Sequence, residues 1–195
     1  MTLGRPMEFD PDEALDAAIH VFWTKGFEAT STKDLMEAMG LSKSSLYQTF
    51  GSKKELFMRS LVRYCAFAGG RERASLDGQK PGKSFIVAML RALSNPDRFP
   101  DDPRGCLLVN STVELGKRDE EVSAYVNNRL RLSLEMFEGA IRNAQESGEI
   151  SPEKDHASLA RMLVMSIHGL KAMSRLNVDQ SDLRPAVEEV LKLLD

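Results

Sequence analysis

The sequence has few cysteines and no long apolar run, and both absences limit the kind of protein it can be. Cys65 and Cys106 are its two cysteines among 195 residues, too few for a disulfide-stabilised scaffold. No apolar stretch approaches the roughly 20 residues of a membrane-spanning helix, and residues 1–10 contain no apolar signal-peptide core. We therefore expect a reduced, cytoplasmic protein that does not enter a membrane.

The sequence also lacks the motifs that mark common enzymes. Its three histidines, His20, His156 and His168, have no metal-ligand spacing with the cysteines. It contains no nucleophile elbow, no phosphate-binding loop and no dinucleotide fingerprint. We therefore expect no catalytic residue, no metal site and no cofactor. A helical enzyme or an adaptor without DNA binding is the alternative class.

Helical periodicity dominates the rest of the chain. Apolar residues recur three and four positions apart between glycine- and proline-rich breaks, which predicts an all-α fold of about nine helices. The first helix starts clearly, with Asp10 as cap and Pro11 at the first helical position. The helices are expected at about residues 10–25, 31–39, 42–50, 53–73, 84–93, 105 onward, 119–146, 155–176 and 183–194.

The two short helices within residues 31–50 have the pattern of a helix-turn-helix. Ser31, with Asp34 three residues later, can cap the first helix, and Gly40 can end it. Ser42 can cap the second helix, which has one narrow apolar stripe. Its opposite side presents hydroxyls, an amide, a phenol and a lysine, so we interpret it as a DNA recognition helix.

The net charge of −3 does not favour a nucleic-acid-binding protein, but the distribution of charge does. Between Gly40 and Tyr64 there are five lysines and arginines and one glutamate, whereas acidic residues gather in the first helix and the distal half. Phosphate contacts need a local basic surface, because salt screens charges more than about 10 Å away. A weakly acidic chain can therefore bind DNA through this segment.

Three consecutive patterns identify the segment further. The chain reads G-F-E-A-T-S at residues 26–31, G-L-S-K-S-S-L-Y-Q-T-F at 40–50 and G-S-K-K-E-L at 51–56. These resemble the TetR family of repressors, whose pattern is G-[FY]-x-x-[TS]-[TS], G-[VL]-S-x-[GS]-x-[LI]-Y-x-x-F and x-S-K-x-x-L. We therefore predict an N-terminal three-helix DNA-binding domain at residues 1–55 and a larger helical effector-binding and dimerisation domain at 56–195. A helix at about 53–73 would bridge the two.

The resemblance implies roles for individual side chains. Phosphate oxygens would be contacted by the hydroxyl, phenol and ammonium groups of Thr30, Ser31, Thr32, Lys43, Tyr47 and Lys53. Base edges would be read by Ser44, Ser45 and Gln48, with Lys33 suited to either role and Ser42 at the cap. Any one of these side chains alone also fits a solvated helix face. Together they imply double-stranded DNA with a palindromic operator, read by recognition helices about 34 Å apart.

The last two expected helices predict a homodimer. The helix at about 155–176 is apolar on several sides, and one chain has too few helices to cover it and the final helix together. We therefore expect a four-helix interface with a second copy around a twofold axis. Its expected residues are Leu159, Met162, Leu163, Leu170, Val187, Val190, Leu191 and Leu194.

The distal domain is expected to hold a small-molecule effector. In TetR relatives such a ligand shifts the dimer away from its DNA-competent shape, and the resemblance implies the same here. No carboxylate cluster and no arginine pair marks a charged ligand, which favours a small, largely apolar molecule. The candidate residues also fit an ordinary apolar core. They are Phe85, Met89, Phe99, Cys106, Val109, Met136, Phe137, Met165 and His168.

Cys106 supports an alternative kind of sensing. It follows Arg104 and Gly105 at an expected helix start, where a cation and the helix dipole make a thiol more reactive. The Gly-Cys-Leu sequence also resembles a branch of the family that includes electrophile and oxidant sensors. A buried, unreactive cysteine is the competing interpretation.

The sequence does not separate repression from activation.

Overall fold

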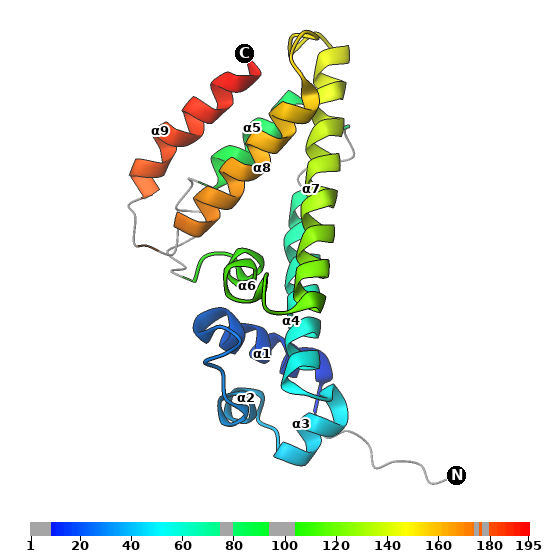
Figure 1. The fold of residues 1–195 in the computed structure, drawn as a ribbon, viewed down its shortest axis with the longest axis vertical. Helices are drawn as coiled ribbons and strands as arrows, with labels where there is room; N and C mark the ends of the chain where they lie inside the picture. Colours follow the sequence, from blue (N-terminus) through cyan, green and yellow to red (C-terminus); the bar gives the residue numbers. More distant parts are fainter. Residues whose placement is uncertain (1–8, 75–79, 94–103, 174–175, 177–179) are drawn as a thin grey trace, which may run out of the picture. The chain divides into compact units, whose positions relative to one another are not determined.

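The computed structural model shows a helical chain, and the residues that it describes are 9–74, 80–93, 104–173, 176 and 180–195, with side chains for all but 69–74 and 180–182. These residues form nine α-helices, one 3₁₀ helix and no strand (Figure 1). The predicted all-α fold is therefore confirmed. The chain forms two compact units, residues 1–67 and 68–195.

The first unit is built around an aromatic core on α1 (Pro11–Lys25). The carboxylate of Asp10 accepts the Asp12 N–H at 2.8 Å, which caps the helix as predicted. The ring of Phe22, fully buried in α1, lies 5.1 Å from the ring of Phe57 in an edge-to-face arrangement. Burial of these rings holds α1 against the start of the fourth helix.

The predicted helix-turn-helix is present in this unit. α2 (Thr32–Met39) ends at Gly40, whose φ of +65° is a left-handed conformation that favours glycine. Leu41 is buried in the turn, and Ser42 caps α3 (Lys43–Phe50). Three residues, 40–42, therefore separate the two helices in a tight turn, as expected from the sequence.

α4 (Lys53–Ala74) starts with the predicted capping box. The Glu55 N–H donates to Ser52 Oγ at 3.1 Å, and the Ser52 N–H donates to Glu55 Oε2 at 2.6 Å. The boundary between the two units falls inside this helix, after Phe67. One continuous helix thus belongs to the first unit at its start and to the second at its end.

The second unit contains the remaining helices. They are α5 (Lys83–Ala92), α6 (Leu107–Leu115), α7 (Glu120–Glu146), α8 (His156–Met173), α9 (Gln180–Leu191) and a 3₁₀ helix (Lys192–Leu194). Asp119 caps α7 by accepting the Val122 N–H at 3.0 Å. Cys106 is the N-cap of α6, so that helix begins close to the place expected.

One apolar core joins α5, α7, α8 and α9 in this unit. Ile86, Leu90, Ile141, Leu163 and Val187 are all fully buried in it. α6 packs against α7 and α8. None of the described helices combines the length and the apolar character that crossing a membrane requires.

The position of this core corrects half of the predicted dimer interface. Leu163, Val187, Leu191 and Leu194 lie in the core of their own unit and are at most 8% exposed. They were expected at a surface because the sequence does not show that α5, α7, α8 and α9 pack around one core. The other four residues, Leu159, Met162, Leu170 and Val190, keep exposed or half-exposed side chains.

Candidate nucleic-acid interface

The outer face of α3 carries polar side chains, and its inner face is buried. Leu46 and Phe50 are 1% and 2% exposed, so the helix is anchored by its apolar stripe. Lys43, Ser44 and Gln48 are exposed on the other side. A short helix held from beneath, with an ammonium, a hydroxyl and an amide outward, has the chemistry to contact phosphates and base edges.

The serines at the start of α3 form a small hydrogen-bonded group. Ser42 Oγ accepts the Ser45 N–H at 3.2 Å and lies 3.0 Å from Ser44 Oγ and 2.9 Å from Ser45 Oγ. Ser42 therefore acts first as the helix cap. The hydroxyls of Ser44 and Ser45 are oriented by this cap before any ligand arrives.

Tyr47 connects the recognition helix to α2. Its hydroxyl is 3.2 Å from the hydroxyl of Thr32, the first residue of α2, and its side chain is 39% exposed. Two hydroxyls from two helices thus meet at one surface point. Such a pair can donate to the same phosphate oxygen or to neighbouring ones.

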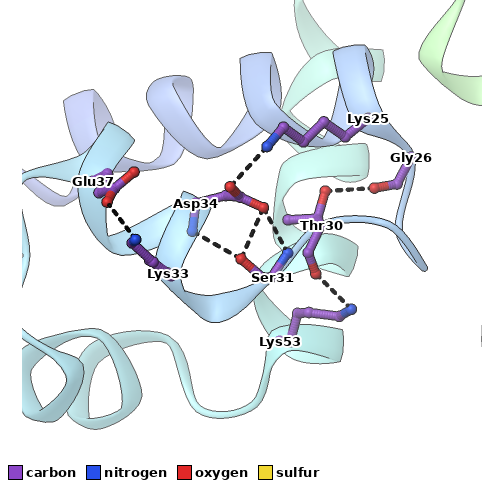
Figure 2. Close-up of polar contacts among 8 residues, drawn as sticks. All are labelled: Lys25, Gly26, Thr30, Ser31, Lys33, Asp34, Glu37 and Lys53. Atoms are coloured by element: carbon purple, nitrogen blue, oxygen red, sulfur yellow. Dashed lines mark hydrogen bonds and ion pairs between the residues drawn. The ribbon is translucent and has the colours of Figure 1, made fainter.

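The start of α2 is organised around Asp34 (Figure 2). Its carboxylate accepts the Ser31 N–H at 2.9 Å, while Ser31 Oγ accepts the Asp34 N–H at 3.1 Å. Lys25 Nζ donates to the other carboxylate oxygen at 2.7 Å. The ammonium of Lys25, followed by the bonds from Ser31, holds the pKa of Asp34 well below its usual range. Asp34 therefore stays ionised and fixes the angle at which α2 begins.

Two predicted phosphate contacts have a different role in the structure. Thr30 is 1% exposed, and its hydroxyl donates to the Gly26 carbonyl at 2.5 Å. Lys53 Nζ donates to the carbonyl of Thr30 at 2.9 Å (Figure 2). It also donates to the carbonyl of Phe27 at 2.9 Å and lies 4.4 Å from the centre of the Phe27 ring. The ammonium is thus used within the protein, where it ties the turn after α1 to the start of α4.

The remaining predicted DNA-contacting residues keep accessible side chains. Ser31, Lys33, Ser42, Lys43, Ser44, Tyr47 and Gln48 are exposed, and Thr32 and Ser45 are half-buried. Lys33 lies 3.7 Å from Glu37 in an exposed pair that water and salt weaken (Figure 2).

The sequence did not point to Arg59. Its Nη1 donates to the Thr49 carbonyl at 3.1 Å, and its guanidinium lies over the Phe50 ring at 5.9 Å. This arginine in α4 therefore fixes the end of α3. Its partner is ten residues away in another helix, and no local pattern reveals such a contact.

The second unit has a small cavity between α5, α7 and α8. Its volume is about 30 Å³. Four of the predicted effector residues line it, namely Met89, Met136, Phe137 and His168. The sequence missed four more, which are Ser133, Val164, Ile167 and Lys171.

The other predicted effector residues lie elsewhere. Phe85, Cys106 and Val109 are buried outside the lining of this cavity. Met165 is 67% exposed on another side of α8, and Phe99 lies outside the described residues. In the part of the chain that the structure describes, no group of three or more histidine, cysteine or acidic side chains is placed to hold a metal ion.

Comparisons with known proteins agree with this architecture. The family profile described as "Bacterial regulatory proteins, tetR family" matches residues 14–59, and "Tetracyclin repressor-like, C-terminal domain" matches residues 84–190. The repressor ComR of Escherichia coli K12 is 31% identical over 97% of this chain and 91% of its own. The uncharacterised regulator YezE of Bacillus subtilis 168 is 29% identical over 99% of this chain and 100% of its own.

A solved structure is similar over the whole chain. It is a cysteine-substituted form of the TetR family transcriptional regulator CifR, complexed with 26-base-pair double-strand operator DNA. It is 31% identical, with a TM-score of 0.86, and the match covers 98% of this chain and 100% of that one.

Proposed function

Because the chain belongs to the TetR family of bacterial regulatory proteins, we propose that it is a ligand-responsive repressor that binds a palindromic operator as a homodimer. Membership of the family makes it a DNA-binding transcriptional regulator and not an enzyme. The observation that carries the proposal is the anchored polar face of α3, with Tyr47 and Thr32 meeting beside it. A protein that acts on an operator works where the DNA is, so we also propose the bacterial cytoplasm.

DNA binding divides between two kinds of contact on this face. Lys43, Tyr47 and Thr32 bind phosphate oxygens, which positions the protein without selecting a sequence. Ser44, Ser45 and Gln48 read base edges in the major groove, and the amide of Gln48 can bond adenine in two places. Ser42 and Lys53 act indirectly, since the structure uses their polar groups to hold α3 and the turn before α2.

The homodimer is supported by an exposed apolar face of α8. Met162, Met165 and Met173 are 48%, 67% and 40% exposed and lie on one side of the helix, with exposed Gly169 between them. Flexible apolar side chains on one helix face favour burial against a second copy of the same face. Such a contact is isologous, and it pairs two recognition helices for a palindromic site.

The ligand response is supported by the cavity beside α8. At about 30 Å³ it has room for about two water molecules, so an effector must move α7 or α8 to enter fully. A ligand that binds only the displaced arrangement shifts the population towards it. The same helix carries the exposed methionines, so such a displacement can alter the proposed dimer.

Selection of binding sites tests the proposal. The purified protein is incubated with a randomised duplex pool, the retained DNA is sequenced, and the enriched duplex is titrated across a salt series. We expect a palindrome whose affinity falls steeply as salt rises. Tyr47→Phe should weaken binding about fivefold, since it removes one hydroxyl contact. Tyr125→Phe in α7 makes the same chemical change in the second unit and is the control.

Three results would overturn the proposal. They are a pool with no enriched sequence, an enriched site without twofold symmetry, and an affinity that does not depend on salt.

A further inference from the structure

α3 is a short helix whose last turn needs support from outside the helix. It has eight residues, and a helix of this length frays at its ends when it is isolated. Leu46 and Phe50 hold its inner face through their buried side chains. These apolar contacts fix the place of the helix, but the backbone carbonyls at its end still require donors from other groups.

Arg59 supplies such a donor from α4. Its Nη1 donates to the Thr49 carbonyl at 3.1 Å, and its guanidinium lies 5.9 Å from the centre of the Phe50 ring. A cation at the carboxyl end of a helix also interacts favourably with the helix dipole. The last turn of α3 is therefore held to α4 by a charged hydrogen bond and by a ring contact.

The backbone that carries Arg59 is itself anchored. Phe57 and Leu61, two residues before and after it, are fully buried. The pKa of Glu55, one turn earlier, lies below its usual value, chiefly because of the bonds from Ser52 and to a smaller extent because of the charge of Arg59. The charge of Arg59 is thus partly balanced within the protein, which leaves less of it for DNA phosphates.

Gln48 is the proposed base-reading residue nearest to this bond. It directly precedes the residue whose carbonyl Arg59 binds, and its side chain is exposed. Ser44 and Ser45 lie in the first turn, where the hydroxyl of Ser42 orients them. The start of α3 is thus fixed by its cap and the end by α4. An amide that bonds a base in two places needs its backbone held to within about 0.5 Å.

We propose that Arg59 is a positioning residue for base recognition by Gln48. It contacts neither base nor phosphate, and it holds the last turn of α3 at the angle from which the Gln48 amide reaches one base pair. The inference rests on the proposed function, in which Gln48 reads a base edge. It adds that discrimination at this base pair depends on a side chain of another helix.

Binding of altered duplexes to the full-length protein tests this role. Each duplex differs from the enriched one in a single base pair, and fluorescence anisotropy gives the ratio of the two affinities. Gln48→Ala identifies the base pair that Gln48 selects, because discrimination falls there. Arg59→Met should reduce discrimination at the same base pair about threefold and leave the other positions and the salt dependence unchanged.

Two further variants separate positioning from other roles. Arg59→Lys keeps a cation that can donate to the same carbonyl, so it should retain most of the discrimination. Arg59→Met combined with Gln48→Ala should cause no further loss at that base pair, because the amide that it positions is gone. Arg59 is exposed, so both replacements leave the apolar core in place.

The matched control is Arg63→Met, which removes the same charge from the same helix. Arg63 binds the carboxylate of Asp16 in α1 through two hydrogen bonds. Its replacement should lower Tm and leave discrimination unchanged. Arg59→Met should do the reverse, with the smaller change in Tm.

Three results for Arg59 overturn the inference alone: unchanged discrimination in Arg59→Met, an equal loss at every base pair with a smaller salt slope, or a further loss in the double variant. The second would mean that Arg59 binds phosphate. Full discrimination in Gln48→Ala would also overturn it and leave DNA binding intact. Failure to enrich any duplex would instead overturn the proposed function and this inference together.

Discussion

Arg63 in α4 binds the carboxylate of Asp16 in α1 through two parallel hydrogen bonds, from Nε to Oδ1 at 2.6 Å and from Nη2 to Oδ2 at 2.8 Å. Its Nη1 also lies 3.2 Å from the carboxylate of Asp12, and its guanidinium lies over the Phe67 ring at 4.9 Å. The paired geometry fixes the direction of α1 relative to the first turns of α4. Protonation of Asp16 would weaken this contact.

Replacing Asp16 by Asn should destabilise the protein in a pH-dependent way. The bonds from Arg63 hold the pKa of Asp16 below its usual value. Its contribution is thus fully present above the unfolded pKa of about 3.9 and is lost as the pH falls through the lower folded pKa. Asp16→Asn should lower Tm by about 2 °C near pH 7, with the difference from the unmodified protein vanishing in stronger acid. Thermal unfolding at a series of pH values from neutral to about pH 2 measures this.

Asp12→Asn is the control for that experiment. Asp12 is 73% exposed and has one contact with Arg63, so its replacement should have a smaller effect. An equal loss of Tm in both variants at every pH would contradict the role assigned to the paired bonds.

Lys53 and Lys43 should affect DNA binding in different ways. Lys53→Met removes the bonds to the Phe27 and Thr30 carbonyls, so it should lower both Tm and affinity and leave the salt dependence unchanged. Lys43→Met removes an exposed cation, so it should keep Tm and reduce the slope of log affinity against log salt by about 0.9. Fluorescence anisotropy at several salt concentrations separates the two. A reduced slope for Lys53→Met would mean that its ammonium leaves the protein for phosphate on binding.

Met165→Glu should separate the proposed dimer. A charge at this 67% exposed position would be buried without a partner if two α8 helices pack together. We expect light scattering to show a monomer and operator affinity to fall at least tenfold, because half of the site is lost. Val113→Glu places the same charge at an 84% exposed apolar residue of α6. If both variants stay dimeric, the interface lies elsewhere.

Cys106→Ser tests the thiol alternative to ligand binding in the cavity. Cys106 is 8% exposed at the N-cap of α6, and serine is a good residue for that position, so the variant should fold. Because a buried thiol reacts slowly, DNA release by quinones or hypochlorite should be the same with and without it. Loss of the response to oxidants in Cys106→Ser would instead establish the thiol as the sensor.

The parts of the fold that could be predicted depend on short sequence separations. Ser31 and Asp34 cap each other three residues apart, as do Ser52 and Glu55, so both helix starts were visible in the sequence. Gly40 ended α2 at the expected place because few other residues adopt its backbone conformation at low cost. These local signals were enough to identify the helix-turn-helix and its exposed face.

The parts that could not be predicted depend on contacts between distant segments. Lys53 is 26 residues from Phe27 in the sequence. A lysine near a helix start is equally consistent with a phosphate contact and with a hydrogen bond inside the protein. Leu163 shows the same limit, since its burial follows from which side of α8 its neighbours cover. The cavity could not be anticipated either, because Phe137 and Val164 line it together only when α7 and α8 pack against each other.

Three side chains of α4 bond to other parts of the first unit. Lys53 holds the turn between α1 and α2, Arg59 holds the end of α3, and Arg63 holds α1, and all three precede Phe67. For protein engineering, these ties make residues 1–67 a transferable cassette. If it were joined through α4 to the second unit of a related regulator, the cassette would keep these internal hydrogen bonds. Such a chimaera could exchange operator preference while the contacts that orient its recognition helix stay in place.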